Sequence, residues 1–86
     1  MKKIEKKLIN YFKKNYQSIK KLKKIPMNKS LVELGYLDSF AVIDLITFIE
    51  KEWSIVIDNE DVSREKMGSI NKMIKLISNK IKMQEG

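Results

Sequence analysis

The chain has 86 residues and a net charge of +7, and it contains neither cysteine nor histidine. This length predicts a single domain, spanning residues 1–86, with one small hydrophobic core. The absence of thiols and imidazoles excludes disulfides, the usual zinc ligand sets and catalysis by cysteine or histidine. We therefore expect neither a self-contained enzyme nor a metal site.

Charge is segregated along the chain. Residues 1–32 hold eleven lysines and one acid, residues 33–65 hold nine acids against Lys51 and Arg64, and residues 66–86 are basic again. The longest apolar runs are too short to cross a bilayer, and Met1 is followed by lysines, not by a signal sequence. We therefore expect a cytoplasmic protein, in agreement with the lack of cysteine.

The first helix is expected to begin near Lys2, because apolar residues recur at roughly helical spacing between pairs of lysines. These residues are Ile4, Leu8, Tyr11 or Phe12, and Ile19. A long loop is predicted somewhere between Asn15 and Lys29, with Pro26 fixing its later part. The simplest interpretation of the lysine pairs is a solvated helix face, and the alternative is a basic surface for nucleic acid or anionic lipid.

The segment Gly35–Phe40 has the features of a helix start. Gly35 can adopt a positive φ, and Asp38 is a good N-cap residue that can accept backbone N–H groups of the following turn. Ser39 then lies at the first helical position, near the positive end of the helix dipole. This environment favours an attached phosphate.

The second helix is expected from about Ser39 to Trp53. Its predicted core face, at helical spacing, is Val42, Leu45, Ile46, Ile49 and Trp53. The remaining side chains near the serine combine apolar groups with one carboxylate, which indicates either a docking surface or packing against the long loop. They are Phe40, Ala41, Ile43, Asp44, Thr47 and Phe48.

After Trp53, residues 55–57 are interpreted as a buried loop, and Asp58–Val62 as a short helix. Ser69 is expected to cap the last helix, whose apolar positions are Ile70, Met73, Ile74, Ile77 and Ile81. We expect Lys80 and the tail, residues 82–86, to fray. The predicted fold is all-α: a small four-helix bundle of three longer helices and one short one, with a long loop between the first and second helices.

The motif Leu34-Gly35-Tyr36-Leu37-Asp38-Ser39-Phe40 resembles the phosphopantetheine attachment site of the acyl carrier protein family. The resemblance continues through Glu50–Ile57, which is similar to the end of the family's second helix and the loop after it, and through Met67–Ile70, which is similar to the start of its last helix. It is clearest over residues 30–78.

This resemblance implies a monomeric carrier with 4'-phosphopantetheine attached to Ser39 and Asp38 as helix cap and motif residue. The arm would hold an acyl or aminoacyl group as a thioester. The implied partners are a phosphopantetheinyl transferase, a loading ligase and a downstream synthase or transferase, which would use Phe40, Ala41, Ile43, Asp44 and Thr47 for docking. The candidate lining of a pocket for the cargo is Ile49, Trp53, Ile57, Met67 and Ile70, and ordinary core packing is the alternative interpretation of these five residues.

The sequence is compatible with several functions. The carrier would serve fatty acid, polyketide or a specialised biosynthesis, and Leu37–Phe40 with Glu50, Asp61 and Lys72 is also similar to carriers of D-alanine or of peptidyl groups. A small basic nucleic-acid-binding helical protein is the alternative from another class. The near absence of arginine and the acidic central segment argue against specific nucleic-acid binding.

Overall fold

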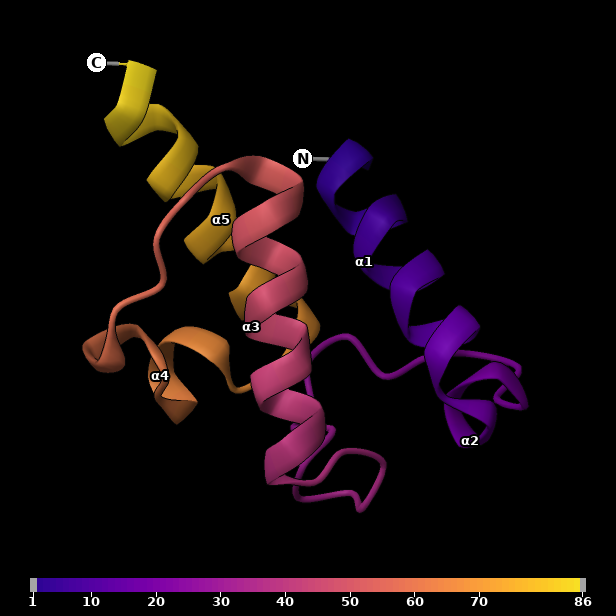
Figure 1. Ribbon diagram of the computed structural model, residues 1–86. Coiled ribbons are helices and arrows are strands. Elements are labelled where there is room, and N and C mark those ends of the chain that lie inside the picture. Colours follow the sequence, from indigo (N-terminus) through magenta and orange to yellow (C-terminus); the bar gives the residue numbers. More distant parts are fainter. Residues whose placement is uncertain (1, 86) are drawn as a thin grey trace.

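The computed structural model describes residues 2–85, which contain no β-strand. Three long helices dominate: α1 (Lys2–Asn15), α3 (Ser39–Trp53) and α5 (Ile70–Glu85). In Figure 1, α3 stands in the middle with α5 behind it, and α1 and α4 lie on opposite sides of α3. The prediction of an all-α fold with a long loop between the first two long helices is confirmed.

The short elements differ from the prediction. The sequence predicts one short helix near Asp58–Val62, whereas the structure has three short segments: α2 (Gln17–Lys20), the 3-10 helix η1 (Asn59–Asp61) and α4 (Arg64–Met67). The backbone becomes extended at Tyr16, between α1 and α2, and the chain then turns so that Ile19 is fully buried. Burial of this single side chain accounts for a helical turn where the local sequence is rich in lysine.

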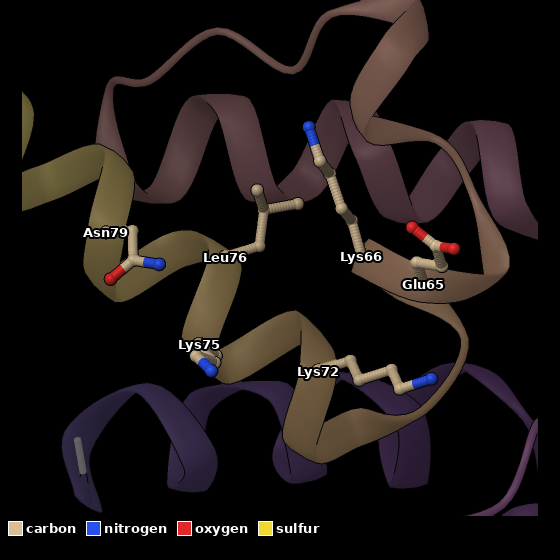
Figure 2. Close-up of a pocket in the computed structure, with 6 residues that line it drawn as sticks. All are labelled: Glu65, Lys66, Lys72, Lys75, Leu76 and Asn79. Carbon is tan, nitrogen blue, oxygen red and sulfur yellow. The ribbon is translucent and has the colours of Figure 1, made fainter.

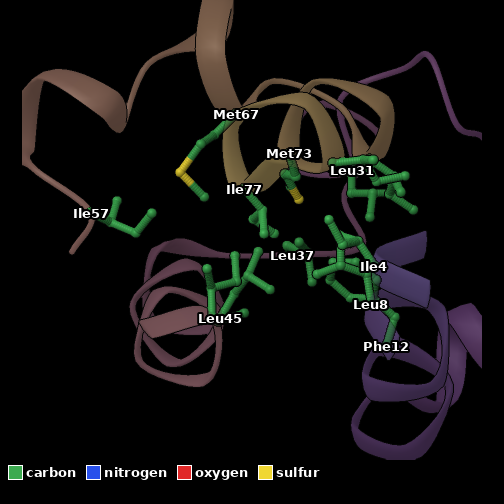
Figure 3. Close-up of a cluster of buried hydrophobic side chains, with 14 of the residues drawn as sticks. Ile4, Leu8, Phe12, Leu31, Leu37, Leu45, Ile57, Met67, Met73 and Ile77 are labelled. Atoms are coloured by element: carbon green, nitrogen blue, oxygen red, sulfur yellow. The ribbon is translucent and has the colours of Figure 1, made fainter. Parts of the chain in front are cut away.

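All three long helices contribute to one hydrophobic core (Figure 3). Ile4, Leu8 and Phe12 of α1 are buried, so Phe12 and not Tyr11 completes the apolar face of this helix. The long loop is anchored in the same core by Ile25, Leu31 and Leu37, and α5 contributes Ile70, Met73, Ile74 and Ile77. The core therefore fixes both ends of the segment that leads into α3.

The buried face of α3 is rotated relative to the prediction. Ala41, Leu45 and Ile49 are buried, whereas Val42 and Ile46 are only half-buried. Because α3 carries apolar residues on most of its circumference, the sequence pattern alone does not decide which side faces inward. The packing of α3 against its neighbours does so instead.

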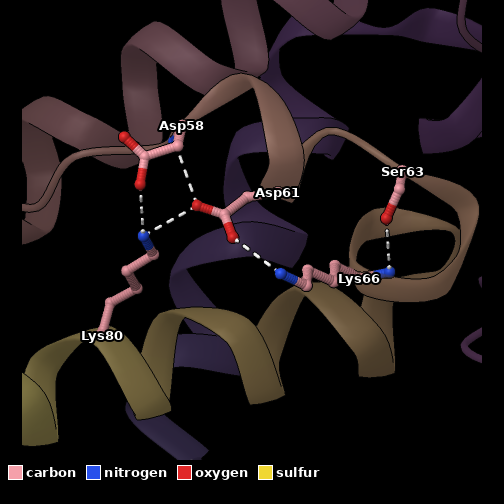
Figure 4. A network of polar contacts seen from close by, with 5 residues as sticks. All are labelled: Asp58, Asp61, Ser63, Lys66 and Lys80. Atoms are coloured by element: carbon pink, nitrogen blue, oxygen red, sulfur yellow. Dashed lines mark hydrogen bonds and ion pairs between the residues drawn. The ribbon is translucent and has the colours of Figure 1, made fainter.

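An ionic network around the buried carboxylate of Asp61 joins the segment after α3 to α5 (Figure 4). Asp61 is 6% exposed; its Oδ2 lies 2.7 Å from Lys80 Nζ and accepts a 3.0 Å hydrogen bond from the Asp58 N–H. Lys66 Nζ lies 3.4 Å from the other carboxylate oxygen. The hydrogen bond from Lys80 holds the pKa of Asp61 below its ordinary value, and the same contact raises the pKa of Lys80. Lys80, expected to fray, is instead half-buried and held by its contact with Asp61.

The last helix continues through Glu85, where the sequence predicts fraying from residue 82. The Gln84 side-chain amide donates a 2.8 Å hydrogen bond to the Ser54 carbonyl oxygen, which ties the end of α5 to the turn after α3. Gly86, also assigned to the frayed tail, lies outside the described residues. Within residues 2–85, no helix combines the length and apolar character required to span a bilayer.

Candidate functional site

The approach to Ser39 is a turn held by backbone hydrogen bonds. The Leu34 N–H donates to the Ser30 carbonyl oxygen at 3.0 Å, and the Tyr36 N–H donates to the Leu31 carbonyl oxygen at 2.9 Å. Gly35 between them has φ +87°, a conformation that glycine adopts without the strain a β-carbon would cause. Buried Leu31 and Leu37 anchor the turn in the core on either side of this glycine.

Asp38 caps α3 as the sequence predicts. Its Oδ1 accepts a 2.8 Å hydrogen bond from the Ala41 N–H, and its carbonyl oxygen accepts one from the Val42 N–H at 3.1 Å. Ser39 follows as the first residue of the helix and is exposed. An exposed hydroxyl thus lies at the positive end of a 15-residue helix, where the first backbone N–H groups favour a negatively charged substituent.

A cavity of about 340 Å³ lies beside this helix start. Val42, one turn beyond Ser39, forms part of its wall, and the opposite wall comes from the region of η1 and α4. The lining residues are Ser30, Val32, Glu33, Val42, Val62, Ser63, Met67 and Gly68. Most of the lining is apolar, so a hollow suited to the apolar part of a ligand reaches Val42, one turn beyond Ser39, although Ser39 itself does not line it.

The five residues expected to shelter cargo are mainly core residues. Ile49, Ile57, Met67 and Ile70 are buried in the common cluster, and half-buried Trp53 packs edge-on against Phe48. Of the five, only Met67 also lines the cavity beside Ser39. The sequence pattern does not assign Val32, Val42 and Val62 to a pocket, because their position at this cavity depends on contacts between segments far apart in the chain.

Four of the five expected docking residues are exposed on α3. Phe40 is 77% and Ile43 59% exposed, and Asp44 and Thr47 are exposed beside them. The structure corrects the assignment of Ala41 to the docking surface. Ala41 is only 8% exposed, because it belongs to the core face of α3, and a partner cannot reach its side chain. Phe48 is half-buried and stacks on Tyr11 of α1, with ring centroids 4.3 Å apart.

A second hollow, of about 380 Å³, lies between α4 and α5 (Figure 2). Its lining is mostly charged or polar: Glu65, Lys66, Lys72, Lys75, Leu76 and Asn79. None of the residues that the sequence assigns to a site lines it. Of these two hollows, the apolar one near the start of α3 is the one that shares a residue, Met67, with the expected site.

The structure thus defines a small all-helical domain that presents a capped, exposed serine at the start of its central helix. The chain is 39% identical over 62 residues to the acyl carrier protein of Buchnera aphidicola subsp. Schizaphis graminum (strain Sg), and this match covers 72% of the chain and 76% of that relative. No family model matches the chain. On this identity and coverage, the chain belongs to the acyl carrier protein family.

Proposed function

We propose that this protein carries acyl or aminoacyl groups between biosynthetic enzymes, as a thioester on a 4'-phosphopantetheine arm attached to Ser39. The observation that supports this most directly is the position of Ser39, exposed at the first residue of α3 and preceded by the Asp38 cap. A transferase needs access to the hydroxyl and a fixed backbone around it, and this helix start supplies both.

The residues around Ser39 fit the proposed arm. The hydroxyl oxygen of Ser39 would form the phosphodiester bond, and the adjacent N–H groups at the start of α3 would face its negative charge. Val42, Val62 and Met67 would offer apolar contacts in the neighbouring cavity. When bound, the arm supplies a terminal thiol that carries the cargo as a thioester, and its tethering raises the local concentration of that cargo at each partner.

The exposed side of α3 supports the proposal of a docking surface for partner enzymes. Phe40 and Ile43 provide apolar contacts, and Asp44 provides a negative charge beside them. Partners with basic patches would be attracted to this part of the chain, which increases the rate of encounter. Thr47 is also exposed on this side of α3, and we include it in the surface. Its hydroxyl donates a 3.1 Å hydrogen bond to the Ile43 carbonyl oxygen of the same helix.

Docking can be tested separately from attachment. The substitution Asp44→Lys reverses the charge at this position. It should lower kcat/KM of a phosphopantetheinyl transferase for this protein by about tenfold, because electrostatic steering of the transferase is lost. Glu60→Lys is the matched control, because Glu60 is also an exposed acid but lies in η1. An equal decrease in both variants would show that only net charge matters and would remove Asp44 from the docking surface.

Attachment itself is tested by modification. Incubation with coenzyme A, magnesium and a broad-specificity phosphopantetheinyl transferase should add a single arm to the protein. A protein that this transferase and the transferase of its own cell both leave unmodified would contradict the proposed function.

A further inference from the structure

The outer face of α1 is a strip of lysines, interrupted by exposed Asn10 between Lys7 and Lys13. With about 100° of rotation per residue, its six lysines fall within an arc of roughly 140° centred opposite the buried face. The buried face is Ile4, Leu8 and Phe12, and the strip consists of Lys2, Lys3, Lys6, Lys7, Lys13 and Lys14. All six side chains are exposed, and the strip extends over about 20 Å of helix.

More exposed lysines follow α1 closely in the chain. Lys20, in α2, and Lys21, Lys23 and Lys24, directly after it, are also exposed. We call these ten lysines the basic face. Among the described residues, only Lys7 of the ten forms an ion pair, with Glu52 Oε2 at 2.6 Å. The basic face therefore keeps a large uncompensated positive charge.

We propose that the basic face docks this protein onto the surface of an anionic phospholipid bilayer. Clusters of lysines on the polar side of an amphipathic helix attract anionic headgroups, and no shape complementarity is required. The exposed large apolar side chains of the described residues are all at Val32 or beyond, so none lies on the basic face. Because the apolar side of α1 is buried in the core, docking is electrostatic and the helix does not insert.

The same observations disfavour other anionic partners. A protein interface concentrates aromatic and apolar groups at its centre and is depleted of lysine, which is the opposite of this face. Single-stranded nucleic acid needs exposed aromatic platforms, whereas Tyr11, Phe12 and Tyr16 are buried or half-buried and pack against one another. Lysine also lacks the bidentate geometry with which arginine recognises bases.

The inference concerns residues 2–24 and is independent of the proposed attachment at Ser39. It is tested by cosedimentation of the folded protein with vesicles of phosphatidylcholine alone or mixed with phosphatidylglycerol. Binding to the mixed vesicles only is expected, together with complete release at about 1 M salt, where the screening length falls to about 3 Å. Ser39→Ala should bind as wild type does.

Two variants with equal loss of charge locate the site. Lys3→Gln, Lys6→Gln, Lys13→Gln and Lys14→Gln together should lower the partition coefficient at least about a hundredfold, since each lysine near the surface contributes about fivefold. The control combines Lys29→Gln, Lys51→Gln, Lys75→Gln and Lys82→Gln, exposed lysines outside the basic face, and should lose less than about tenfold. Circular dichroism verifies that both variants are folded.

Three results would overturn the proposal. If the wild-type protein does not cosediment with the phosphatidylglycerol-containing vesicles at low salt, it has no membrane-docking face. Equal losses in the two four-lysine variants would show an effect of net charge alone. Tighter binding to an RNA homopolymer than to the vesicles at physiological salt, lost in the variant of the basic face, would assign this face to nucleic acid.

Discussion

Lys80 Nζ lies 2.7 Å from Asp61 Oδ2 and connects the middle of α5 to the end of η1. Asp61 is almost fully buried, and its carboxylate also accepts the Asp58 N–H and faces Lys66. A buried carboxylate without its cation is strongly unfavourable. This pair therefore fixes the segment between α3 and α5, which forms one wall of the cavity beside Ser39.

Removing the cation should destabilise the fold. Lys80→Met leaves Asp61 with only the more distant Lys66, and we expect the free energy of unfolding to fall by about 3 kcal/mol, within the range for a broken buried pair. Lys66→Met is the control and should cost less than about 1 kcal/mol, because Lys66 is half-exposed and its contact is 3.4 Å long. Urea unfolding of both variants measures this difference. Equal effects would contradict the role given to Lys80.

The same pair predicts a specific dependence on pH. The pKa of Asp61 is lower in the folded protein than its ordinary value of 3.8, so the stability it contributes is fully present above pH 3.8 and is lost as pH falls through the folded pKa. The destabilisation caused by Asp61→Asn should therefore be largest near neutral pH and should shrink in acid. Urea unfolding of wild type and Asp61→Asn across this range tests it. A destabilisation that grows as the pH falls would show the opposite sign.

The start of α3 was predictable because its signals are local. Gly35, Asp38 and Ser39 lie within five residues, and the structure places each as the motif predicts: a positive φ, an N-cap and the first helical residue. Attachment of the phosphopantetheine arm at Ser39 is inferred from the family motif and stays a prediction.

The features that the sequence analysis missed depend on tertiary contacts. Ala41 has a small side chain that is equally acceptable inside or outside, and its burial is set by how α3 packs. Lys80 lies in a lysine-rich tail, a composition that predicts fraying. The ion pair that holds it in place is not visible in the local sequence, because its partner Asp61 is 19 residues away. α4 is a single turn capped by Ser63, whose Oγ accepts the Lys66 N–H at 3.2 Å, and such short turns have no apolar periodicity to reveal them.

The cap at Asp38 can be separated from its charge. Asp38→Ala removes the acceptor for the Ala41 N–H and should lower the free energy of unfolding by about 0.5–2 kcal/mol, and it should slow modification at Ser39 because the helix start loosens. Asp38→Asn keeps a side-chain oxygen and should stay within about 0.5 kcal/mol of wild type. Thermal or urea unfolding, with modification rates measured in parallel, distinguishes the two. An alanine variant as stable as wild type would show that the cap does not stabilise α3.

Attachment of the carrier arm at Ser39 is tested by measuring the intact mass of the protein after modification. Ser39→Ala should change the free energy of unfolding by less than about 1 kcal/mol, since the side chain is exposed and Asp38 provides the cap. Wild type, Ser39→Ala and the control Ser18→Ala, which alters an exposed serine in α2, are each incubated with coenzyme A, magnesium and a phosphopantetheinyl transferase. We expect one added arm on wild type and on Ser18→Ala and none on Ser39→Ala. Equal modification of Ser39→Ala would rule out Ser39 as the attachment site.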